Sequence, residues 1–156
     1  AEQALAFMQN CRKLGLAVHG DFIIGLPGET HETIERTMQF AEKLDCETIQ
    51  VSIAHPYPGT EFDEYARSHG YITEDDMSDE LGHQLPNIQY PGLDRHEIVE
   101  AVEYFYGRYY FRPRIVFRIV RRALFDGEER IRLFKEAKEY LQLRARRKRF
   151  SRAKAC

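Results

Sequence analysis

Hydrophobic and polar positions repeat with two different periods along the first part of the chain. Apolar residues recur at helical spacing over residues 2–14, 31–44 and 61–69, which predicts three helices with one apolar face each. Residues 16–24 are almost continuously apolar and residues 46–54 alternate, which predicts two strands between these helices. Elements in this order indicate an α/β fold whose two strands are parallel and joined by a right-handed crossover.

Each predicted strand runs into a short loop rich in glycine and proline, at residues 25–28 and 55–59. Glycine lets the backbone turn sharply and approach a ligand closely, and proline stiffens the loop. Thr30 and Thr60 follow these loops as predicted N-caps of the next helices. The carboxyl ends of parallel strands share one sheet edge, where α/β proteins bind ligands, so the loops predict a ligand site. The glycines alone fit an ordinary βα turn equally well.

The pattern changes after these units. Residues 71–92 are acidic and irregular, which predicts either a long excursion over the mouth of the fold or a solvated surface loop. Asp94 and Glu97 form a capping-box pattern that opens a helix over residues 95–111. This helix is rich in aromatic residues, and most of their rings are expected to pack in a core.

Charge divides the chain into two parts. Residues 1–107 contain 6 Lys/Arg and 20 Asp/Glu, a balance of −14, whereas residues 108–156 contain 17 and 5, a balance of +12. A helix that opens at Pro113 has aliphatic residues on one side and arginines on the other, and helical patterning resumes over residues 128–150. This pattern fits a solvated basic face or a helix on an anionic membrane surface. Nucleic acid is the less favoured partner, because no compact RNA-binding module follows.

Cysteine usage and hydropathy narrow the class of protein. Cys11, Cys46 and Cys156 are far apart, which fits reduced thiols in the cytoplasm and gives no metal-ligand spacing. The apolar share of 43% is enough for a core, and every apolar run is far shorter than a membrane span. We expect one cytoplasmic domain, or a domain with an appendage. The opening at Ala1, without an initiator methionine or a signal peptide, leads us to expect upstream sequence.

The two loops and their strands resemble a known family. Phe-Ile-Ile-Gly-Leu-Pro-Gly-Glu-Thr at residues 22–30 and Ile-Gln-Val-Ser-Ile-Ala-His-Pro-Tyr-Pro-Gly-Thr-Glu at residues 49–61 resemble the later barrel strands of radical S-adenosylmethionine (SAM) enzymes. The Pro-Tyr-Pro-Gly-Thr loop is typical of the subgroup with an upstream cobalamin-binding domain. Within that subgroup, the whole chain, including residues 85–92, looks like the carboxyl-terminal part of the hopanoid-biosynthesis-associated radical SAM proteins.

The resemblance implies a fold and an activity. The implied fold is α/β, the carboxyl-terminal portion of a partial TIM-type β/α barrel followed by a helical extension. Its parts are distal βα units at residues 1–70, a loop and an aromatic helix that close the barrel at 71–111, and a basic helical extension at 112–156. The activity is cleavage of SAM to a 5′-deoxyadenosyl radical that abstracts hydrogen from a lipid, here the polyol side chain of a hopanoid such as bacteriohopanetetrol. A tetrapyrrole or RNA substrate, and a small non-enzymatic α/β interaction module, are the alternatives.

The same resemblance implies that SAM lies across both loops. The predicted cofactor-binding residues are Ile23, Gly25, Leu26, Pro27, Gly28, His55 and Tyr57. Apolar side chains suit an adenine face, and exposed backbone amides suit its ring nitrogens. Glu29 is expected to cap the following helix rather than to touch SAM. No catalytic or metal-binding side chain is assigned, because the cofactor carries the difficult step.

The family's iron–sulfur motif lies outside this chain. The family holds a [4Fe–4S] cluster through Cys-x-x-x-Cys-x-x-Cys, and Cys11, Cys46 and Cys156 do not supply that spacing. The resemblance therefore implies that the cluster, and cobalamin where it is used, are bound by the part of the enzyme N-terminal to Ala1. The chain by itself is expected not to cleave SAM. If its basic helix binds lipid, the enzyme works at the inner face of the membrane.

Overall fold

The computed structural model describes residues 1–73 and 87–125, together with residues 131, 135 and 138. The chain forms two compact units, residues 1–102 and residues 103–156. The acidic centre of the predicted excursion and most of the last predicted helix, with the basic tail, lie outside the described residues. The domain boundaries implied by the family resemblance stay a prediction.

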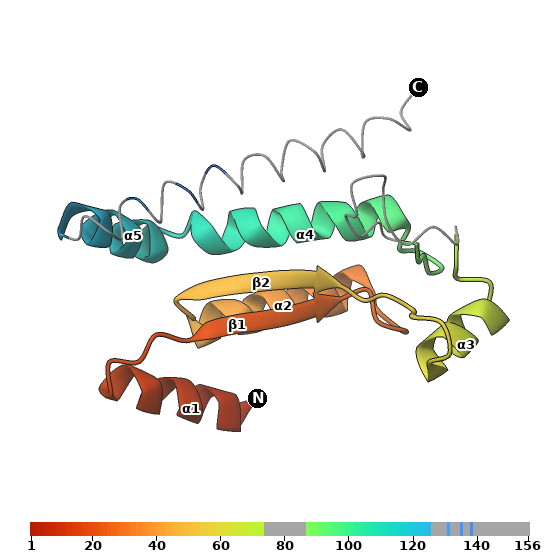
Figure 1. Cartoon of the computed structure of the whole chain (residues 1–156), viewed down its shortest axis with the longest axis horizontal. Coiled ribbons are helices and arrows are strands. Elements are labelled where there is room, and N and C mark those ends of the chain that lie inside the picture. The colour runs from red at the N-terminus through yellow and green to blue at the C-terminus, as the bar shows by residue number, and fades with distance from the viewer. Residues whose placement is uncertain (74–86, 126–130, 132–134, 136–137, 139–156) are drawn as a thin grey trace. The chain divides into compact units, whose positions relative to one another are not determined.

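The first unit is a mixed α/β arrangement in which helices and strands alternate, as predicted (Figure 1). The helices agree with the predicted ranges to within one residue at each end. Helix α4 begins in the first unit and continues into the second. The elements that begin in the first unit are α1 (Glu2–Lys13), β1 (His19–Ile24), α2 (His31–Leu44), β2 (Thr48–Ile53), α3 (Glu61–Ser68) and α4 (Arg95–Tyr110).

β1 and β2 form a two-stranded parallel sheet, which confirms the predicted parallel pairing. The register runs from the pair His19 and Thr48 to the pair Ile24 and Ile53. Both strands start later than predicted, because regular pairing begins only at His19 and Thr48. The described residues form one sheet of two strands. Two strands do not establish the barrel that the family resemblance implies.

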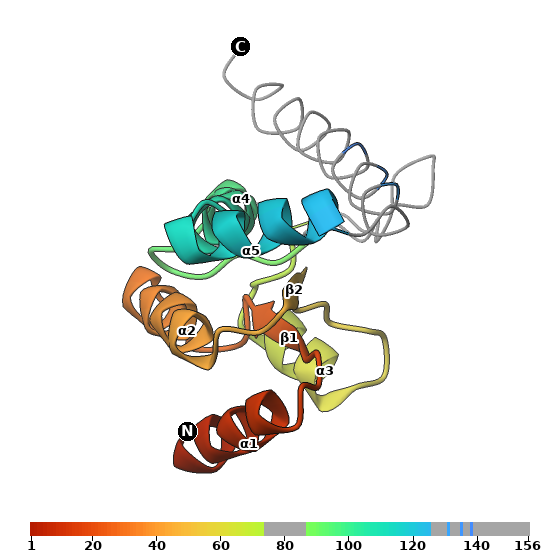
Figure 2. The same ribbon diagram turned by 90° about the vertical axis from the view of Figure 1, so that its left-hand side faces the viewer.

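One face of the sheet is covered and the other is open. Successive side chains of a strand point to opposite faces, and in β1 Phe22 and Ile24 are buried whereas Asp21 and Ile23 are exposed. Helix α2 contacts β1, and it lies on one side of the strand pair when the sheet is seen end-on (Figure 2). The apolar positions of α2 repeat at helical spacing and are all buried: Ile34, Met38, Ala41 and Leu44.

The predicted helix starts are confirmed by their capping hydrogen bonds. Thr30 Oγ1 accepts the backbone N–H of Thr33 at 3.2 Å, and the Thr33 hydroxyl accepts the N–H of Thr30 in return. At the start of α3, Thr60 Oγ1 accepts the backbone N–H of Asp63 at 3.2 Å. At the start of α4, Asp94 Oδ1 accepts the N–H of Glu97 at 2.9 Å, and the Glu97 carboxylate accepts the N–H of Asp94 at 2.7 Å. These side chains satisfy N–H groups that a helix cannot pair internally.

The second unit contains the rest of α4 and helix α5 (Pro113–Phe125). Two aromatic side chains of α4, Phe105 and Tyr109, are fully buried, as predicted. Tyr104 is exposed, so the aromatic character of α4 is not entirely core packing. The predicted apolar stripe of α5 is also divided, because Ile115 is buried whereas Leu124 is exposed. Within the described residues, no helix is both long and apolar enough to cross a membrane.

Candidate functional site

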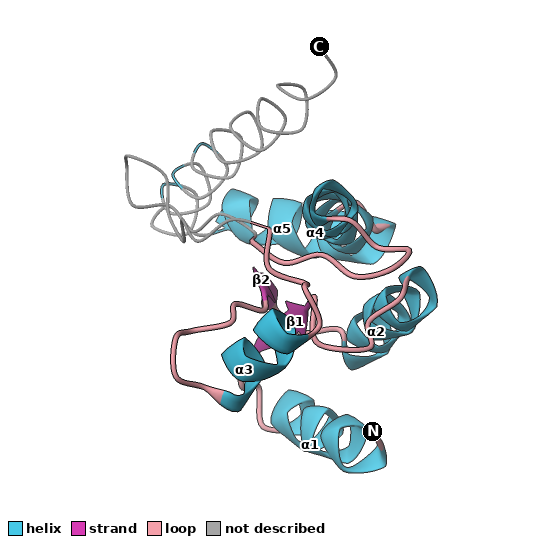
Figure 3. Cartoon of the chain, turned by 90° about the vertical axis from the view of Figure 1, so that its right-hand side faces the viewer, coloured by secondary structure: helices cyan, strands magenta, loops and turns pink. Residues whose placement is uncertain are grey.

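Two loops leave the sheet at the same edge. Because β1 and β2 are parallel and in register, Ile24 and Ile53 lie side by side at the carboxyl ends of the strands. The backbone N–H of Ala54 donates to the Ile24 carbonyl at 2.7 Å, which ties the two exits together. In Figure 1 both arrowheads point toward this edge, and Figure 3 looks onto it with α3 in front. We call residues 25–29 the first loop, residues 55–60 the second loop, and both together the rim.

The first loop contains a tight turn with proline and glycine at its centre. The backbone N–H of Glu29 donates to the Leu26 carbonyl at 3.0 Å, which closes a four-residue turn. Pro27 occupies the second position and Gly28, with a φ of 82°, the third. This is the arrangement of a type II turn, where the third residue needs a positive φ. The turn leads directly into the capped start of α2.

The second loop repeats this turn. The backbone N–H of Thr60 donates to the Tyr57 carbonyl at 3.2 Å, with Pro58 second and Gly59, at a φ of 81°, third. The N–H of Gly59 also donates to the Asp63 carboxylate at 3.3 Å. Each strand of the pair therefore ends in a proline–glycine turn that is followed at once by a capped helix.

Gly25 joins β1 to the first loop and has both of its backbone polar groups bound. Its φ is 82°, which favours glycine. Its N–H donates to Glu29 Oε2 at 3.0 Å, and its carbonyl accepts a buried hydrogen bond from the Tyr90 hydroxyl at 2.8 Å. A Cβ atom at this position would lie 3.5 Å from a methyl carbon of Ile53 and 3.6 Å from one of Ile98. Gly25 therefore shapes the rim through its backbone and does not offer a free amide.

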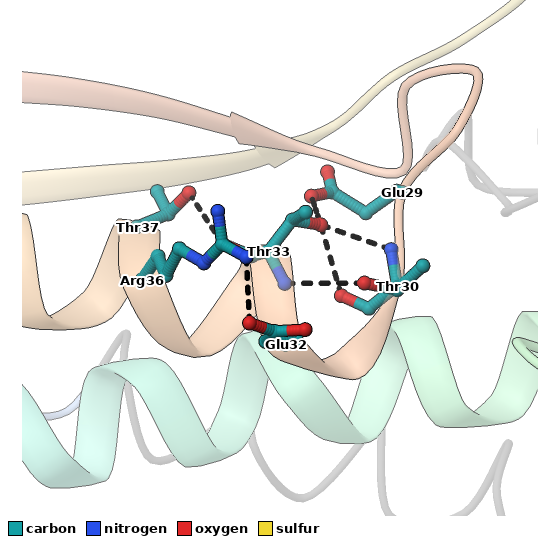
Figure 4. Close-up of polar contacts among 6 residues, drawn as sticks. All are labelled: Glu29, Thr30, Glu32, Thr33, Arg36 and Thr37. Carbon is teal, nitrogen blue, oxygen red and sulfur yellow. Dashed lines mark hydrogen bonds and ion pairs between the residues drawn. The ribbon is translucent and has the colours of Figure 1, made fainter.

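Glu29 connects the first loop to the helix behind it (Figure 4). Besides accepting from Gly25, its carboxylate accepts a hydrogen bond from the Thr33 hydroxyl in the first turn of α2. Glu29 thus contacts a side chain in the first turn of α2 and holds the loop backbone, whereas the N-cap of the helix is Thr30. The ion pair of Arg36 with Glu32, at 2.6 Å, lies on the exposed side of the same helix.

Three predicted site residues present exposed apolar side chains at the rim. The exposed fractions are 55% for Ile23, 47% for Leu26 and 55% for Tyr57. Leu26 and Tyr57 hold the same position, the first, in the two turns. All three side chains therefore belong to the end of β1 or to the two loops that leave the same edge of the sheet.

His55 is the buried polar residue of the second loop. Its side chain is only 9% exposed, and its Nε2 atom has no hydrogen-bond partner among the described residues. The edge of its ring faces Tyr57, with ring centroids 5.1 Å apart. Burial lowers the pKa of His55 below its usual value, so the ring is neutral at pH 7. In a neutral imidazole, an unpaired nitrogen can donate or accept one hydrogen bond, depending on the tautomer, and so can pair with a neutral group of a ligand.

The burial of His55 predicts a pH dependence of stability. Because the pKa of His55 is lower in the folded than in the unfolded state, its contribution is fully present above the unfolded pKa of about 6.5 and is lost as the pH falls below it. We expect the free energy of unfolding in urea to fall less between pH 7.5 and pH 5.5 in His55→Gln than in the unmodified chain. His69→Gln removes an exposed histidine and is the matched control. An equal fall in all three proteins would contradict the assignment.

The structure brings the predicted residues of both loops to one edge, but two residues that shape this edge were not predicted to do so. Tyr90 lies 65 positions after Gly25, and no spacing in the sequence links them. Glu29 was predicted as a capping residue, and its contact with the loop amide was not. Whether the predicted residues bind SAM is not tested by the fold and stays a prediction.

The described residues do not provide a site for an iron–sulfur cluster. Cys11 and Cys46 are buried in the first unit as thiols that are not joined in a disulfide. Across the part of the chain that the structure describes, no group of three His, Cys, Asp or Glu side chains is placed to hold a metal ion. A cluster of the family type needs three thiolates together. The buried thiols therefore do not fit this group.

Comparison with known proteins finds enzymes that transfer methyl or methylthio groups. The chain is 48% identical over 65 residues to an uncharacterised methyltransferase of Pyrococcus horikoshii, a match that covers 42% of this chain and 14% of that protein. It is 34% identical over 76 residues to the bacteriochlorophyllide d C-8(2)-methyltransferase of Chlorobaculum tepidum, covering 49% and 17%. It is 36% identical over 67 residues to the tRNA-2-methylthio-N(6)-dimethylallyladenosine synthase of Ehrlichia chaffeensis, covering 42% and 15%.

The matched part of this chain thus spans less than a fifth of the length of each of these curated relatives. No family model matches the chain, and no solved structure does. The relatives support the coarser part of the expectation, a relationship to methyltransferases and methylthiotransferases.

Proposed function

We propose that this chain is the distal part of a radical SAM enzyme, and that its rim holds the adenosine of SAM. The observation that carries the proposal is the pair of matching proline–glycine turns at one sheet edge, each with an exposed apolar side chain in its first position. Relatives that transfer methyl or methylthio groups support the same conclusion. The edge also agrees with the general rule that ligands of open α/β sheets bind outside the carboxyl ends of the strands.

The rim residues divide the work of binding between them. In this proposal Leu26 and Tyr57 cover the two sides of an adenine ring, and the exposed Ile23 adds apolar surface at the end of β1. Pro27 and Gly28 fix the turn that presents Leu26, so that little loop entropy is lost when the cofactor binds. When bound and reductively cleaved, SAM supplies the carbon radical that abstracts hydrogen from the substrate. The side chains of this chain orient the cofactor and exclude water from it.

His55 serves as the polar contact of the proposed site. The His55 ring lies beside the Tyr57 ring, and in this proposal the loop shifts on binding so that its buried Nε2 pairs with a hydroxyl or amino group of the nucleoside. Because the ring is neutral at pH 7, it neither repels the cationic cofactor nor requires a counter-ion. A ligand hydrogen bond would satisfy a buried nitrogen that otherwise costs the fold about 1–3 kcal/mol.

Binding of SAM to the full-length protein tests the proposal through Tyr57. We expect Tyr57→Ala to weaken SAM binding about tenfold, because one base–aromatic stack contributes about 1–3 kcal/mol. Tyr104→Ala removes another exposed tyrosine outside the rim loops and should leave binding unchanged. Binding is measured by calorimetry, and formation of 5′-deoxyadenosine from SAM and a reductant is measured in parallel. A full-length protein that neither binds SAM nor forms 5′-deoxyadenosine would overturn the proposed function.

The substrate, the further cofactors and the membrane contact are narrower parts of the proposal. As the substrate we propose a hopanoid polyol, on the resemblance of the whole chain alone. A tetrapyrrole or an RNA is the alternative, since two relatives are named for a bacteriochlorophyllide and for a tRNA. We propose that sequence N-terminal to Ala1 holds the [4Fe–4S] cluster and, where used, cobalamin. Contact with an anionic membrane is supported by α5, where Phe117 and Leu124 are exposed on the same helix as Arg114 and Arg121.

A further inference from the structure

The segment that returns to the rim before α4 contains a third turn of the same kind. The backbone N–H of Leu93 donates to the Tyr90 carbonyl at 3.0 Å, with Pro91 second and Gly92, at a φ of 79°, third. As in the other two turns, a capped helix follows. The first position differs, however. Tyr90 is only 8% exposed, whereas Leu26 and Tyr57 present their side chains to solvent.

Tyr90 directs its side chain at the first loop instead of at a ligand. Its hydroxyl donates to the Gly25 carbonyl at 2.8 Å in a buried hydrogen bond. The backbone N–H of Gly25 in turn donates to the Glu29 carboxylate at 3.0 Å. Gly25 is therefore fixed from two directions by residues that are distant from each other in the sequence. The backbone at the exit of β1 has little freedom while both bonds are made.

The hydroxyl of Tyr90 is held in its donor form. Burial, and the nearby carboxylate of Glu29, raise the pKa of Tyr90 well above its usual value. The phenol therefore stays protonated across the pH range in which proteins are folded, and a protonated phenol can donate to a carbonyl. The bond to Gly25 is thus a constant feature of the fold and not a titrating one.

A row of rings connects Tyr90 to the helix that follows the second loop. The edge of the Tyr90 ring meets Tyr71, with centroids 5.1 Å apart. Tyr71 stacks on His69 at 5.4 Å, and His69 stacks on Tyr65 of α3 at 4.1 Å. Helix α3 is capped by Thr60, the last residue of the second loop. Through this row, the helix behind one loop is in packing contact with the residue that holds the other loop.

We propose that Tyr90 is a positioning residue for the cofactor rim, which holds Gly25 in its binding shape and links the first loop to the helix of the second. Tyr90 does not touch the ligand, since its hydroxyl is committed to the Gly25 carbonyl and its ring is buried. It acts by holding the backbone of Gly25, from which the turn that carries Leu26 follows directly. This inference rests on the proposed function, and it adds to it a residue that fixes the geometry of the site.

The test is Tyr90→Phe in the full-length protein, which removes the hydroxyl and keeps the ring. Without the hydrogen bond we expect amide hydrogen exchange of residues 25–29 to become faster in the absence of SAM. We expect the dissociation constant for SAM to rise roughly three- to tenfold, the range that one lost hydrogen bond gives. The maximal rate at saturating SAM should change less than the apparent affinity. Tyr104→Phe removes an exposed hydroxyl elsewhere and is the control.

The outcomes separate the inference from the function on which it rests. Faster exchange together with weaker binding in Tyr90→Phe alone supports the positioning role. If the unmodified protein binds SAM and Tyr90→Phe matches it in both exchange and affinity, only the inference is overturned. If the unmodified protein fails to bind SAM, the proposed function fails and the positioning role fails with it. Thermal unfolding of Tyr90→Phe excludes a general loss of folding as the cause.

Discussion

Gly25→Val in the full-length protein is expected to weaken SAM binding about tenfold or more while leaving a folded enzyme. A φ of 82° is strongly unfavourable for a β-branched residue, so the backbone at the exit of β1 must move. An added Cβ atom would already be in van der Waals contact with Ile53 and Ile98. Any movement there disturbs the hydrogen bonds that Gly25 makes with Glu29 and Tyr90, and with them the first loop.

Gly15→Val is the matched control for this variant. Gly15 also has a positive φ, 70°, and no atom lies within 4 Å of an added Cβ. It connects α1 to β1, before the strand begins, and so takes no part in the rim. Both variants should lose about 1–3 kcal/mol of stability through backbone strain, which chemical unfolding measures. Calorimetry should then show weaker SAM binding in Gly25→Val alone. Equal affinities in the two variants would place the cofactor away from the first loop.

Ile24→Ala is expected to destabilise the chain by about 2–5 kcal/mol, the usual cost of emptying a fully buried aliphatic site. Ile24 is completely buried at the end of β1. Its carbonyl accepts the N–H of Ala54, so the residue sits where the two strands exit together. Removing its side chain leaves a cavity directly beneath the rim, which the surrounding residues can fill only in part. Urea unfolding of the chain followed by circular dichroism measures the loss.

Ile23→Ala is the matched control, because it deletes the same atoms from the neighbouring residue on the opposite face of β1. Ile23 is 55% exposed, so Ile23→Ala should change the unfolding free energy by no more than about 0.5 kcal/mol. In the full-length protein, however, the same change should weaken SAM binding, because Ile23 belongs to the proposed adenosine surface. Ile24→Ala is thus expected to lower the free energy of unfolding, and Ile23→Ala to lower the affinity for SAM. A large stability loss in Ile23→Ala would show that this face is covered.

Local patterns in the sequence were sufficient to predict the elements of the first unit. The helical spacing of α2 and the capping residues Thr30, Thr60 and Asp94 depend on neighbours within four positions, so they are visible in sequence. The parallel pairing of β1 with β2 follows from the strand–helix–strand order. The strand starts were predicted too early because apolar character continues beyond the residues that pair.

The contacts that complete the candidate site depend on distant parts of the chain and have no local signal. The hydrogen bond from Tyr90 to Gly25 joins positions 65 apart. The irregular sequence before Tyr90 did not indicate that its side chain would point toward the first loop. The burial of His55 is likewise set by packing around the second loop and not by its neighbours in sequence. In α5 the periodicity was correct, but it did not show that Leu124 would be exposed. Periodicity identifies an apolar face without identifying what covers it.

The repeated proline–glycine turn has a consequence for how such a rim can vary. In all three copies the backbone is fixed by the proline, the glycine and the closing hydrogen bond, none of which involves the side chain in the first position. The side chain in the first position differs among the copies: it is leucine at position 26 and tyrosine at positions 57 and 90. If the rim binds SAM as proposed, exchanging residues 26 and 57 alone is expected to change its ligand preference and to leave the loops themselves intact.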